Sequence, residues 1–339
     1  MEKINDIDQP ILSQIAQIEE ICANIKPVAV VRCITYNHGA YIKNALDGFI
    51  MQHTHFPFIV IVHDDASTDE TTYILKEYAN KYPDIIFPII EPENLYSKQN
   101  GAISRIINAA CYATRAKYIA MCEGDDYWID PYKLQKQVDF LESHPDYGMC
   151  YTKVKRYNQQ NKKYIDVWGG ANETMDKLLI ENTIPTLTAV FHKAIYDKYL
   201  TEIHPSKRGW LMGDYPIWLY FAQNSKIKFI NETTGVYRIC TESASHSNDI
   251  EKIIRFNNSY HDIRTWYNSR QNTVPQKKLD QNQAVLLFNS SVFRNSKEYA
   301  KLYYKRIENK TPKIRIKYWA CMLGVYPFFH FLSNSNYNR

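Results

Sequence analysis

Glu123-Gly-Asp-Asp-Tyr-Trp128 is the stretch that decides the fold of this 339-residue chain. It follows Tyr118-Ile-Ala-Met-Cys122, an apolar run that predicts a buried strand. Asp130 and Pro131 come next and predict the N-cap and the first position of a helix. Three carboxylates therefore lie on one strand-to-helix turn, the place where open α/β sheets bind ligands. Oxygen ligands on such a turn hold a divalent cation that takes its other ligands from water and phosphate; an acidic surface turn is the alternative.

The composition indicates a globular protein with an uneven distribution of charge. Hydrophobic residues make up 45% of the chain, which supports a sizeable core. The net charge of +5 hides an asymmetry, because residues 251–339 hold 16 Lys and Arg against 5 Asp and Glu. The preceding residues hold 25 against 31. A basic tail of this kind either contacts an anionic partner or packs beside the acidic body.

Cysteine usage and hydropathy favour a cytoplasmic protein. The seven cysteines form no Cys-x-x-Cys pair, so we expect reduced, buried thiols rather than a zinc ribbon or a disulfide framework. The N-terminus shows no signal sequence, and no apolar run reaches 18 residues, so no transmembrane span is predicted. We expect no nucleic-acid partner.

Strand and helix patterns alternate along the first half of the chain. Near-continuous apolar runs predict strands, and apolar residues repeating every three to four positions predict helices. The expected strands are residues 28–35, 58–62, 85–90, 118–122 and 148–154, and the expected helices are 7–25, 40–52, 70–82, 103–114 and 131–144. Such alternation is typical of a doubly wound, mostly parallel sheet. Further strands are expected at 187–191, 227–230 and 235–239, a helix at 214–222, and basic, aromatic helices from residue 250 onward.

Two further polar loops follow expected strands. Thr35-Tyr36-Asn37 ends the first strand, and Asp64-Asp65-Ala-Ser67 ends the second. The carboxyl ends of neighbouring parallel strands share one crevice, so these loops should lie beside the acidic turn. A carboxylate there accepts a hydrogen bond from a base or a ribose hydroxyl. The chain has neither Gly-x-Gly-x-x-Gly after its first strand nor a P-loop, which counts against a dinucleotide fold and a P-loop enzyme.

In this order the three motifs resemble the inverting glycosyltransferases of family 2, over residues 27–246. The resemblance implies the GT-A fold, a Rossmann-like α/β architecture with a mostly parallel sheet and helices on both faces. It implies a nucleotide-diphosphate-sugar donor, with a UDP-sugar expected first, and Mg²⁺ or Mn²⁺. The acceptor would be a hydroxyl of a glycan or lipid-linked molecule, in surface polysaccharide biosynthesis. We expect an N-terminal helix (1–26), the GT-A domain (27–246) and a helical, basic C-terminal extension (247–339).

The resemblance also implies roles for particular residues. Asp125 and Asp126 match the metal-binding acidic motif, while Glu123 replaces its usual first aspartate and either ligates the metal or holds the ribose. The nucleotide-sugar contacts would come from the strand-end loops: Thr35, Tyr36, Asn37, Asp64 and Asp65.

Two later segments match the family as well. Trp210-Leu-Met-Gly-Asp-Tyr215 resembles the segment that carries the catalytic base, which makes Asp214 the candidate; the alternative is a helix N-cap. Residues 237–246 resemble the segment that closes over the diphosphate. There Arg238 would offset charge and His246 would ligate the metal or contact phosphate, unless both are structural.

The C-terminal stretch 313–332 is basic and then strongly aromatic. One interpretation is a peripheral contact with the inner face of the cell membrane, near a lipid-linked acceptor, with Trp319, Phe328 and Phe329 inserting. The other is a helix that covers the body of the protein. A catalytically silent module that binds a sugar nucleotide or a glycan is the alternative function. A nucleotidyltransferase is less favoured, because no Gly-rich basic loop follows the first strand.

Overall fold

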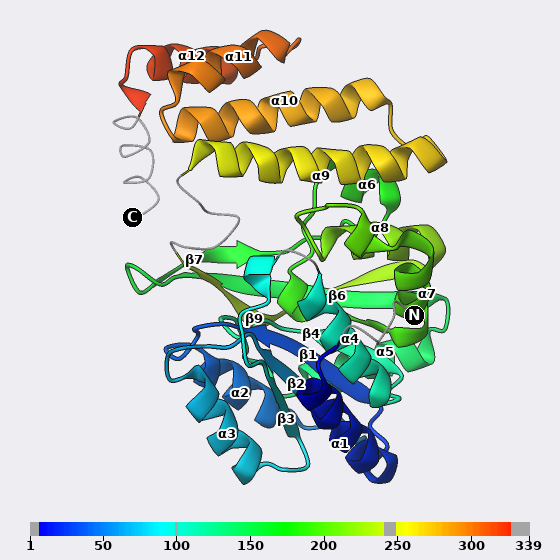
Figure 1. Ribbon diagram of the computed structural model, residues 1–339. Coiled ribbons are helices and arrows are strands. Elements are labelled where there is room, and N and C mark those ends of the chain that lie inside the picture. The colour runs from blue at the N-terminus through cyan, green and yellow to red at the C-terminus, as the bar shows by residue number, and fades with distance from the viewer. Residues whose placement is uncertain (1–6, 99–100, 241–248, 327–339) are drawn as a thin grey trace. The chain divides into compact units, whose positions relative to one another are not determined.

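The computed structural model describes residues 7–98, 101–240 and 249–326 (Figure 1). It divides into two compact units whose segments alternate along the chain. The first unit contains Met1–Thr174, Asn182–Gly209 and Ile217–Ile239. The second contains Met175–Glu181, Trp210–Pro216 and Cys240–Arg339. His246, Phe328 and Phe329, which carried predictions, lie outside the described residues.

One sheet forms the centre of the first unit, with the strand order β3-β2-β1-β4-β8-β6-β9-β5 and with β7 added to β6. The pairings among β3, β2, β1 and β4 are parallel, as expected. The remaining strands are mixed: β8 runs antiparallel to β4 and β6, whereas β9 runs parallel to β6 and antiparallel to β5. The strands are β1 Ala29–Thr35, β2 Phe58–Asp64, β3 Ile86–Ile90, β4 Tyr118–Met121, β5 Tyr127–Trp128, β6 Tyr147–Asn158, β7 Lys163–Trp168, β8 Val190–His192 and β9 Lys226–Ile239.

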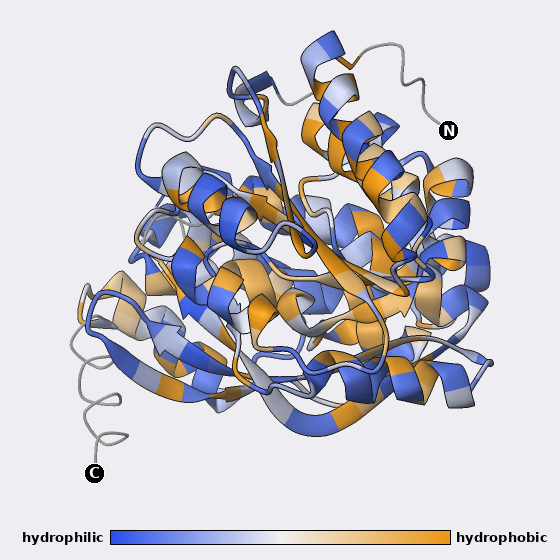
Figure 2. Cartoon of the chain, turned by 90° about the horizontal axis from the view of Figure 1, so that it is seen from below, coloured by the Kyte–Doolittle hydropathy of each residue, from blue (hydrophilic) through white to orange (hydrophobic). Residues whose placement is uncertain are grey.

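Helices cover both faces of this sheet. Alternate side chains of β1 and β2, such as Val31 and Val60, pack with α2, α3 and α5 in one continuous core. The intervening residues point to the opposite face, where α1 and α4 contact strands β1 to β3. Figure 2 shows the hydrophobic strands between helices whose outer surfaces are largely hydrophilic. The helices are α1 Gln9–Ile25, α2 Ile42–Ile50, α3 Thr71–Lys81, α4 Ala102–Ala113, α5 Lys133–Ser143, α7 Lys193–Ile203 and α8 Tyr215–Asn224, with short 3₁₀ turns at Tyr96–Lys98, Thr186–Thr188 and Pro205–Lys207.

The second unit is helical. It contains α6 Met175–Ile180, α9 Ile250–Gln271, α10 Gln276–Phe293, α11 Lys297–Arg306 and α12 Pro312–Met322. Side chains of α10, α11 and α12 form a separate apolar cluster around Phe288. The two short segments from earlier in the chain are hydrogen-bonded into this unit: Arg264 donates to the carbonyl of Leu179, and Tyr267 donates to that of Pro216 at 2.8 Å.

The α/β fold class predicted from the sequence is confirmed by this architecture and by the similar structures described below. One local expectation is wrong: α5 begins at Lys133, not at Pro131, and Asp130 is not its N-cap. The Asp130 carboxylate instead accepts from the backbone N–H of Tyr132 at 2.9 Å, which closes a turn before the helix. Within the described residues, no helix has the length and apolar character needed to cross a membrane.

Candidate functional site

The acidic turn is held against the end of β1. Beyond β4, the backbone N–H of Gly124 still donates to the carbonyl of Ile34 at 3.0 Å, so the turn continues the pairing of the two strands. A Cβ at Gly124 would lie 2.7 Å from Thr35 Oγ1 and 2.9 Å from a methyl carbon of Ile42. Only glycine leaves room there, and this close approach brings two of the three predicted motifs together.

Asp126 faces inward and braces the turn. Its side chain is 4% exposed, and its Oδ1 accepts from the backbone N–H of Arg238 at 2.7 Å. Burial raises the pKa of the Asp126 carboxyl well above its ordinary value, and the neighbouring charge of Asp125 raises it further. This environment disfavours the ionised carboxylate unless a cation offsets it.

Asp125 has the opposite environment. It is half-buried, and its carboxylate makes no hydrogen bond to any residue that the structure describes. Glu123 is half-buried on the same turn. The described residues contain no group of three His, Cys, Asp or Glu side chains that would form a complete metal site. Glu123, Asp125 and Asp126 supply oxygen ligands, the type that Mg²⁺ prefers, and a bound cation stays a prediction.

Arg238 ties this turn to its surroundings. It is 7% exposed, and its Nε donates to the carbonyl of Asp125 at 2.8 Å. Its two terminal nitrogens donate to Gln159 at 2.6 Å and to Asn44 at 3.2 Å. The guanidinium also lies 4.8 Å from the ring centroid of Tyr41. These bonds make Arg238 a structural support of the turn, and a contact with diphosphate stays a prediction.

The Asp64-Asp65 loop is close by, but its carboxylates already have partners. Asp64 is fully buried and accepts from the hydroxyls of Ser67 and Thr72. Asp65 is 1% exposed and accepts from the backbone N–H groups of Leu95 at 2.7 Å and Tyr96 at 3.0 Å. Both carboxylates therefore shape the loop, and a nucleotide contact would have to use lone pairs that these bonds leave.

The loop after β1 is joined to the same region. The N–H of Asn37 donates to Ser67 Oγ at 2.9 Å, and Asn37 Oδ1 accepts from the N–H of Thr68 at 2.8 Å. The Thr35 hydroxyl is buried and has no hydrogen-bond partner among the described residues. Tyr36 is 43% exposed. The structure thus brings the two strand-end loops together with the acidic turn, as the sequence predicts.

Two residues near the turn were missed by the sequence analysis. His38 follows Asn37 and is half-buried, and its Nδ1 has no partner among the described residues. Burial lowers the pKa of its imidazole, although the charges of Asp125 and Asp69 oppose that effect. The only available signal was its place directly after the Thr-Tyr-Asn loop.

Lys133 is the other missed residue. Its side chain is fully buried, its Nζ lies 4.0 Å from the ring centroid of Trp128, and it donates to Gln137 Oε1 at 2.7 Å. Burial lowers the pKa of this ammonium from 10.5 to about 7. The acidic turn therefore leads into a short strand that packs over a buried lysine. Nothing in the sequence distinguished Lys133 from a surface lysine of a helix.

Asp214 belongs to the second unit. It is half-buried, and its Oδ1 accepts from the backbone N–H of Tyr215, the first residue of α8, at 2.7 Å. The segment is fixed on either side, because Leu211 N donates to Ser259 Oγ and Tyr215 OH donates to the carbonyl of Leu178, both at 2.8 Å. A Cβ at Gly213 would meet open space. The carboxylate is thus held at an accessible loop-to-helix junction.

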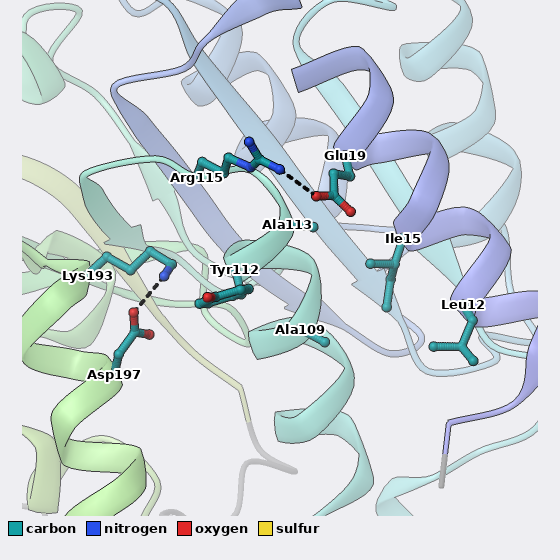
Figure 3. A pocket seen from close by; sticks show the side chains of 9 residues that line it. All are labelled: Leu12, Ile15, Glu19, Ala109, Tyr112, Ala113, Arg115, Lys193 and Asp197. Atoms are coloured by element: carbon teal, nitrogen blue, oxygen red, sulfur yellow. Dashed lines mark hydrogen bonds and ion pairs between the residues drawn. The ribbon is translucent and has the colours of Figure 1, made fainter. Parts of the chain in front are cut away.

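A pocket of about 720 Å³ lies elsewhere in the first unit, between α1, α4 and the start of α7 (Figure 3). Two ion pairs cross its lining, Arg115 with Glu19 at 3.0 Å and Lys193 with Asp197 at 2.6 Å. It lies beside the segment that enters β4, whereas the acidic turn follows the end of that strand. None of the predicted site residues lines it, so the candidate site is defined by its chemistry and not by this pocket.

This chain is similar to known proteins in sequence and in fold. The model of the family described as glycosyl transferase family 2 matches residues 31–201, just over half of the chain. The uncharacterized protein Rv1520 of Mycobacterium tuberculosis is 36% identical over 218 residues, covering 63% of this chain and 59% of that protein. EpsE of Bacillus subtilis, named as a glycosyltransferase, is 36% identical over 208 residues, covering 61% and 71%. The chain thus spans less than two thirds of the mycobacterial relatives that it matches.

A solved structure has the same fold. S. aureus TarS, residues 1–349 in complex with UDP-GlcNAc, superposes with a TM-score of 0.54 over 86% of this chain and 78% of that one, at 16% identity. The mixed sheet with helices on both faces thus has the fold of the GT-A class. The family match goes further: the chain belongs to glycosyl transferase family 2. The family predicted from the sequence is therefore confirmed.

Proposed function

We propose that this protein transfers a sugar from a nucleotide-diphosphate-sugar donor to an acceptor hydroxyl, with inversion at the anomeric carbon. The observation that carries the proposal is the Asp125 carboxylate, which is half-buried and makes no hydrogen bond to the described residues, on a turn pressed against β1. The carboxylates of Asp64 and Asp65, by contrast, accept hydrogen bonds from their own chain. An unpaired one is available to a ligand.

Asp125 would hold Mg²⁺ or Mn²⁺ together with the donor, and Glu123, Asp126 and His246 are the other candidate ligands. The cation would stabilise the negative charge that develops on the departing nucleotide diphosphate. Within the protein, Arg238 keeps the turn in place through its bond to the Asp125 carbonyl. The strand-end loops would orient the nucleotide through Thr35, Tyr36, Asn37, Asp64 and Asp65.

Asp214 would act on the acceptor side. A sugar hydroxyl is a weak nucleophile at neutral pH, so its attack requires a group that takes the proton. In this scheme the proton passes to the Asp214 carboxylate while the acceptor oxygen bonds to the anomeric carbon and the diphosphate leaves from the opposite side. Attack from that side inverts the anomeric configuration. A positioned base of this kind contributes on the order of 10²–10⁴ in rate.

The donor is expected to be a UDP-sugar, and the acceptor a glycan or lipid-linked hydroxyl in the synthesis of a surface polysaccharide. The same proposal includes a location on the cytoplasmic side of the cell membrane, where a lipid-linked acceptor would be reached. UDP-GlcNAc, the ligand in the TarS structure, is a reasonable first donor to test.

Calorimetry with a panel of nucleotide sugars, with and without Mn²⁺, tests the donor site. We expect Mn²⁺-dependent binding of one donor, its loss in Asp125→Asn, and normal binding in Asp84→Asn, which removes an exposed carboxylate at a distant turn. Unchanged Mn²⁺-dependent affinity in Asp125→Asn would exclude Asp125 as the ligand.

Turnover of Asp214→Asn tests the base. Asparagine keeps the shape and still accepts from Tyr215 N–H, but it takes up no proton. We expect donor affinity and melting temperature to hold while turnover falls by about two orders of magnitude or more. Near-normal turnover would remove Asp214 from the mechanism. Donor binding without transfer to any acceptor by the unaltered protein would favour the silent binding module.

A further inference from the structure

Helix α12 has apolar residues on two faces, and only one of them is buried. Ala320 and Cys321 are buried, and Ile314, Tyr318 and Met322 pack against the apolar cluster of the second unit. On the other face Ile316 is 65% exposed, Trp319 61% and Leu323, directly after the helix, 73%. The spacing of three and four residues aligns these three side chains along one side. We call them the α12 stripe.

Large apolar side chains that are this exposed and this close together mark an interaction surface. The charges around the stripe indicate the kind of partner. Lys313 and Arg315 are exposed on the same helix, and no Asp or Glu occurs between residues 309 and 326. Burial lowers the pKa of the Lys317 ammonium, and repulsion from Lys313 lowers it further. The helix therefore presents an apolar stripe between positive charges that nothing on it offsets.

We propose that the α12 stripe inserts into the interfacial layer of an anionic lipid membrane, with Lys313 and Arg315 contacting the headgroups. Apolar residues with flanking Lys and Arg are the pattern of helices that lie in this layer. Tryptophan is enriched at the boundary between headgroups and hydrocarbon, which suits Trp319. A second copy of the chain fits less well, because a symmetric contact would place the two positive surfaces against each other.

The membrane contact deepens the proposed location and does not depend on glycosyl transfer. Its test can therefore fail while the donor site and the base hold, and the reverse is also true.

Sedimentation of the full chain with vesicles tests the contact. We expect the protein to bind vesicles of phosphatidylcholine with phosphatidylglycerol, and much less those of phosphatidylcholine alone. Binding should weaken with salt, since the attraction is screened over about 8 Å at physiological ionic strength. Ile316→Ser combined with Leu323→Ser should reduce binding about tenfold or more, because both side chains lose their burial in the membrane. The matched control Tyr73→Ser, at a residue 71% exposed on α3, should leave it unchanged.

A separate pair of double variants tests the contribution of the basic residues of α12. Lys313→Glu with Arg315→Glu should reduce binding to the anionic vesicles about tenfold or more, given roughly fivefold for each basic residue at the surface. Lys43→Glu with Lys76→Glu makes the same change in net charge at exposed positions of α2 and α3 and should have a much smaller effect. Equal losses in both pairs would show non-specific attraction and overturn the assignment.

Fluorescence quenching gives an independent measurement that needs no disruptive substitution. Lipids with brominated chains should quench the unaltered protein more than Trp319→Phe, and the difference is the signal of Trp319 in the membrane. The proposal is overturned if the two are quenched alike or if the unaltered protein binds neither kind of vesicle. It is also overturned if the stripe variants change only the molecular mass in ultracentrifugation, which would assign the stripe to a second copy.

Discussion

Two Asp-Asp pairs lie at the ends of β2 and β4, the two strands that flank β1 in the sheet, and they differ in what their carboxylates contact. Asp64 and Asp65, after β2, are buried and accept hydrogen bonds from their own chain. Asp125 and Asp126, after β4, differ from each other: the Asp126 carboxylate accepts from the Arg238 backbone N–H, and the Asp125 carboxylate makes no hydrogen bond to the described residues. Identical dipeptides at equivalent strand ends thus have different chemistry. A carboxylate that its own chain leaves without donors keeps all of its lone pairs available to a ligand.

The largest expected difference in stability is between two variants that each replace one aspartate, one from each pair. Asp64→Ala removes the acceptor for Ser67 and Thr72 in a fully buried place. We expect it to lower the free energy of unfolding by about 3 kcal/mol or more, because the part-buried hydroxyls of Ser67 and Thr72 both lose their acceptor. Asp125→Ala should change it by less than about 0.5 kcal/mol. Urea unfolding of both variants measures the contrast, and equal losses would contradict it.

The buried lysine beneath the acidic turn gives a pH-dependent test. An unfolded lysine titrates near 10.5, whereas the folded Lys133 has a pKa of about 7. Between these values the unfolded chain binds the extra proton, so this residue's contribution to stability rises with pH from about 7 to 10.5. Below pH 7 the penalty for burying the charge is fully present.

Lys133→Met should therefore stabilise the protein at pH 6 by about 2–3 kcal/mol relative to its effect at pH 9. The measurement is chemical unfolding of both proteins at the two pH values. Because other groups titrate in the same range, the difference between the proteins is the quantity that matters. A difference that does not vary with pH would show that Lys133 keeps its charge when folded.

The smallest effects should come from the two turns themselves, with opposite signs. Gly124→Ala places a Cβ 2.7 Å from Thr35 Oγ1, and overpacking of this kind costs about 1–3 kcal/mol. Ala66 lies in the other turn at a φ of 59°, a left-handed conformation that alanine adopts at a cost. Ala66→Gly should stabilise by about 0.5 kcal/mol, after the greater freedom of glycine in the unfolded chain is subtracted. Thermal unfolding measures both effects. If Gly124→Ala stabilised the protein, the added Cβ would not be overpacked against Thr35.

The sequence predicted the parallel strands and the loops at their ends, because apolar runs and the polar residues after them are local signals. It did not reveal β7, which pairs with β6 in a local hairpin. It also did not reveal the antiparallel insertion of β8, since the pairings of β8 with β4 and β6 depend on contacts between distant segments. The same limit applies within the site. Nothing local distinguishes Asp65, bonded to Leu95 and Tyr96, from Asp125, and Arg238 contacts Asp125 across 113 residues of sequence.

The candidate base Asp214 illustrates a further limit. Its motif is visible in the sequence, but its membership of the second unit is not. Helical periodicity after residue 250 predicts an appended extension. Hydrogen bonds such as that of Leu211 to Ser259 show instead that segment 210–216 is packed with those later helices.

Because segment 210–216 packs with the C-terminal helices, a change in those helices also changes the surroundings of Asp214. A homologue that acquired different C-terminal helices would also lose Ser259, the partner of Leu211, and Tyr260, whose ring centroid lies 4.7 Å from that of Tyr215. Leu211 and Tyr215 lie on either side of the candidate base Asp214. Recombination at the end of β9 would then separate segment 210–216, which holds the candidate base Asp214, from the helices with which it packs. Chimeras of family members should accordingly tolerate crossovers within the sheet better than crossovers that separate 210–216 from α9.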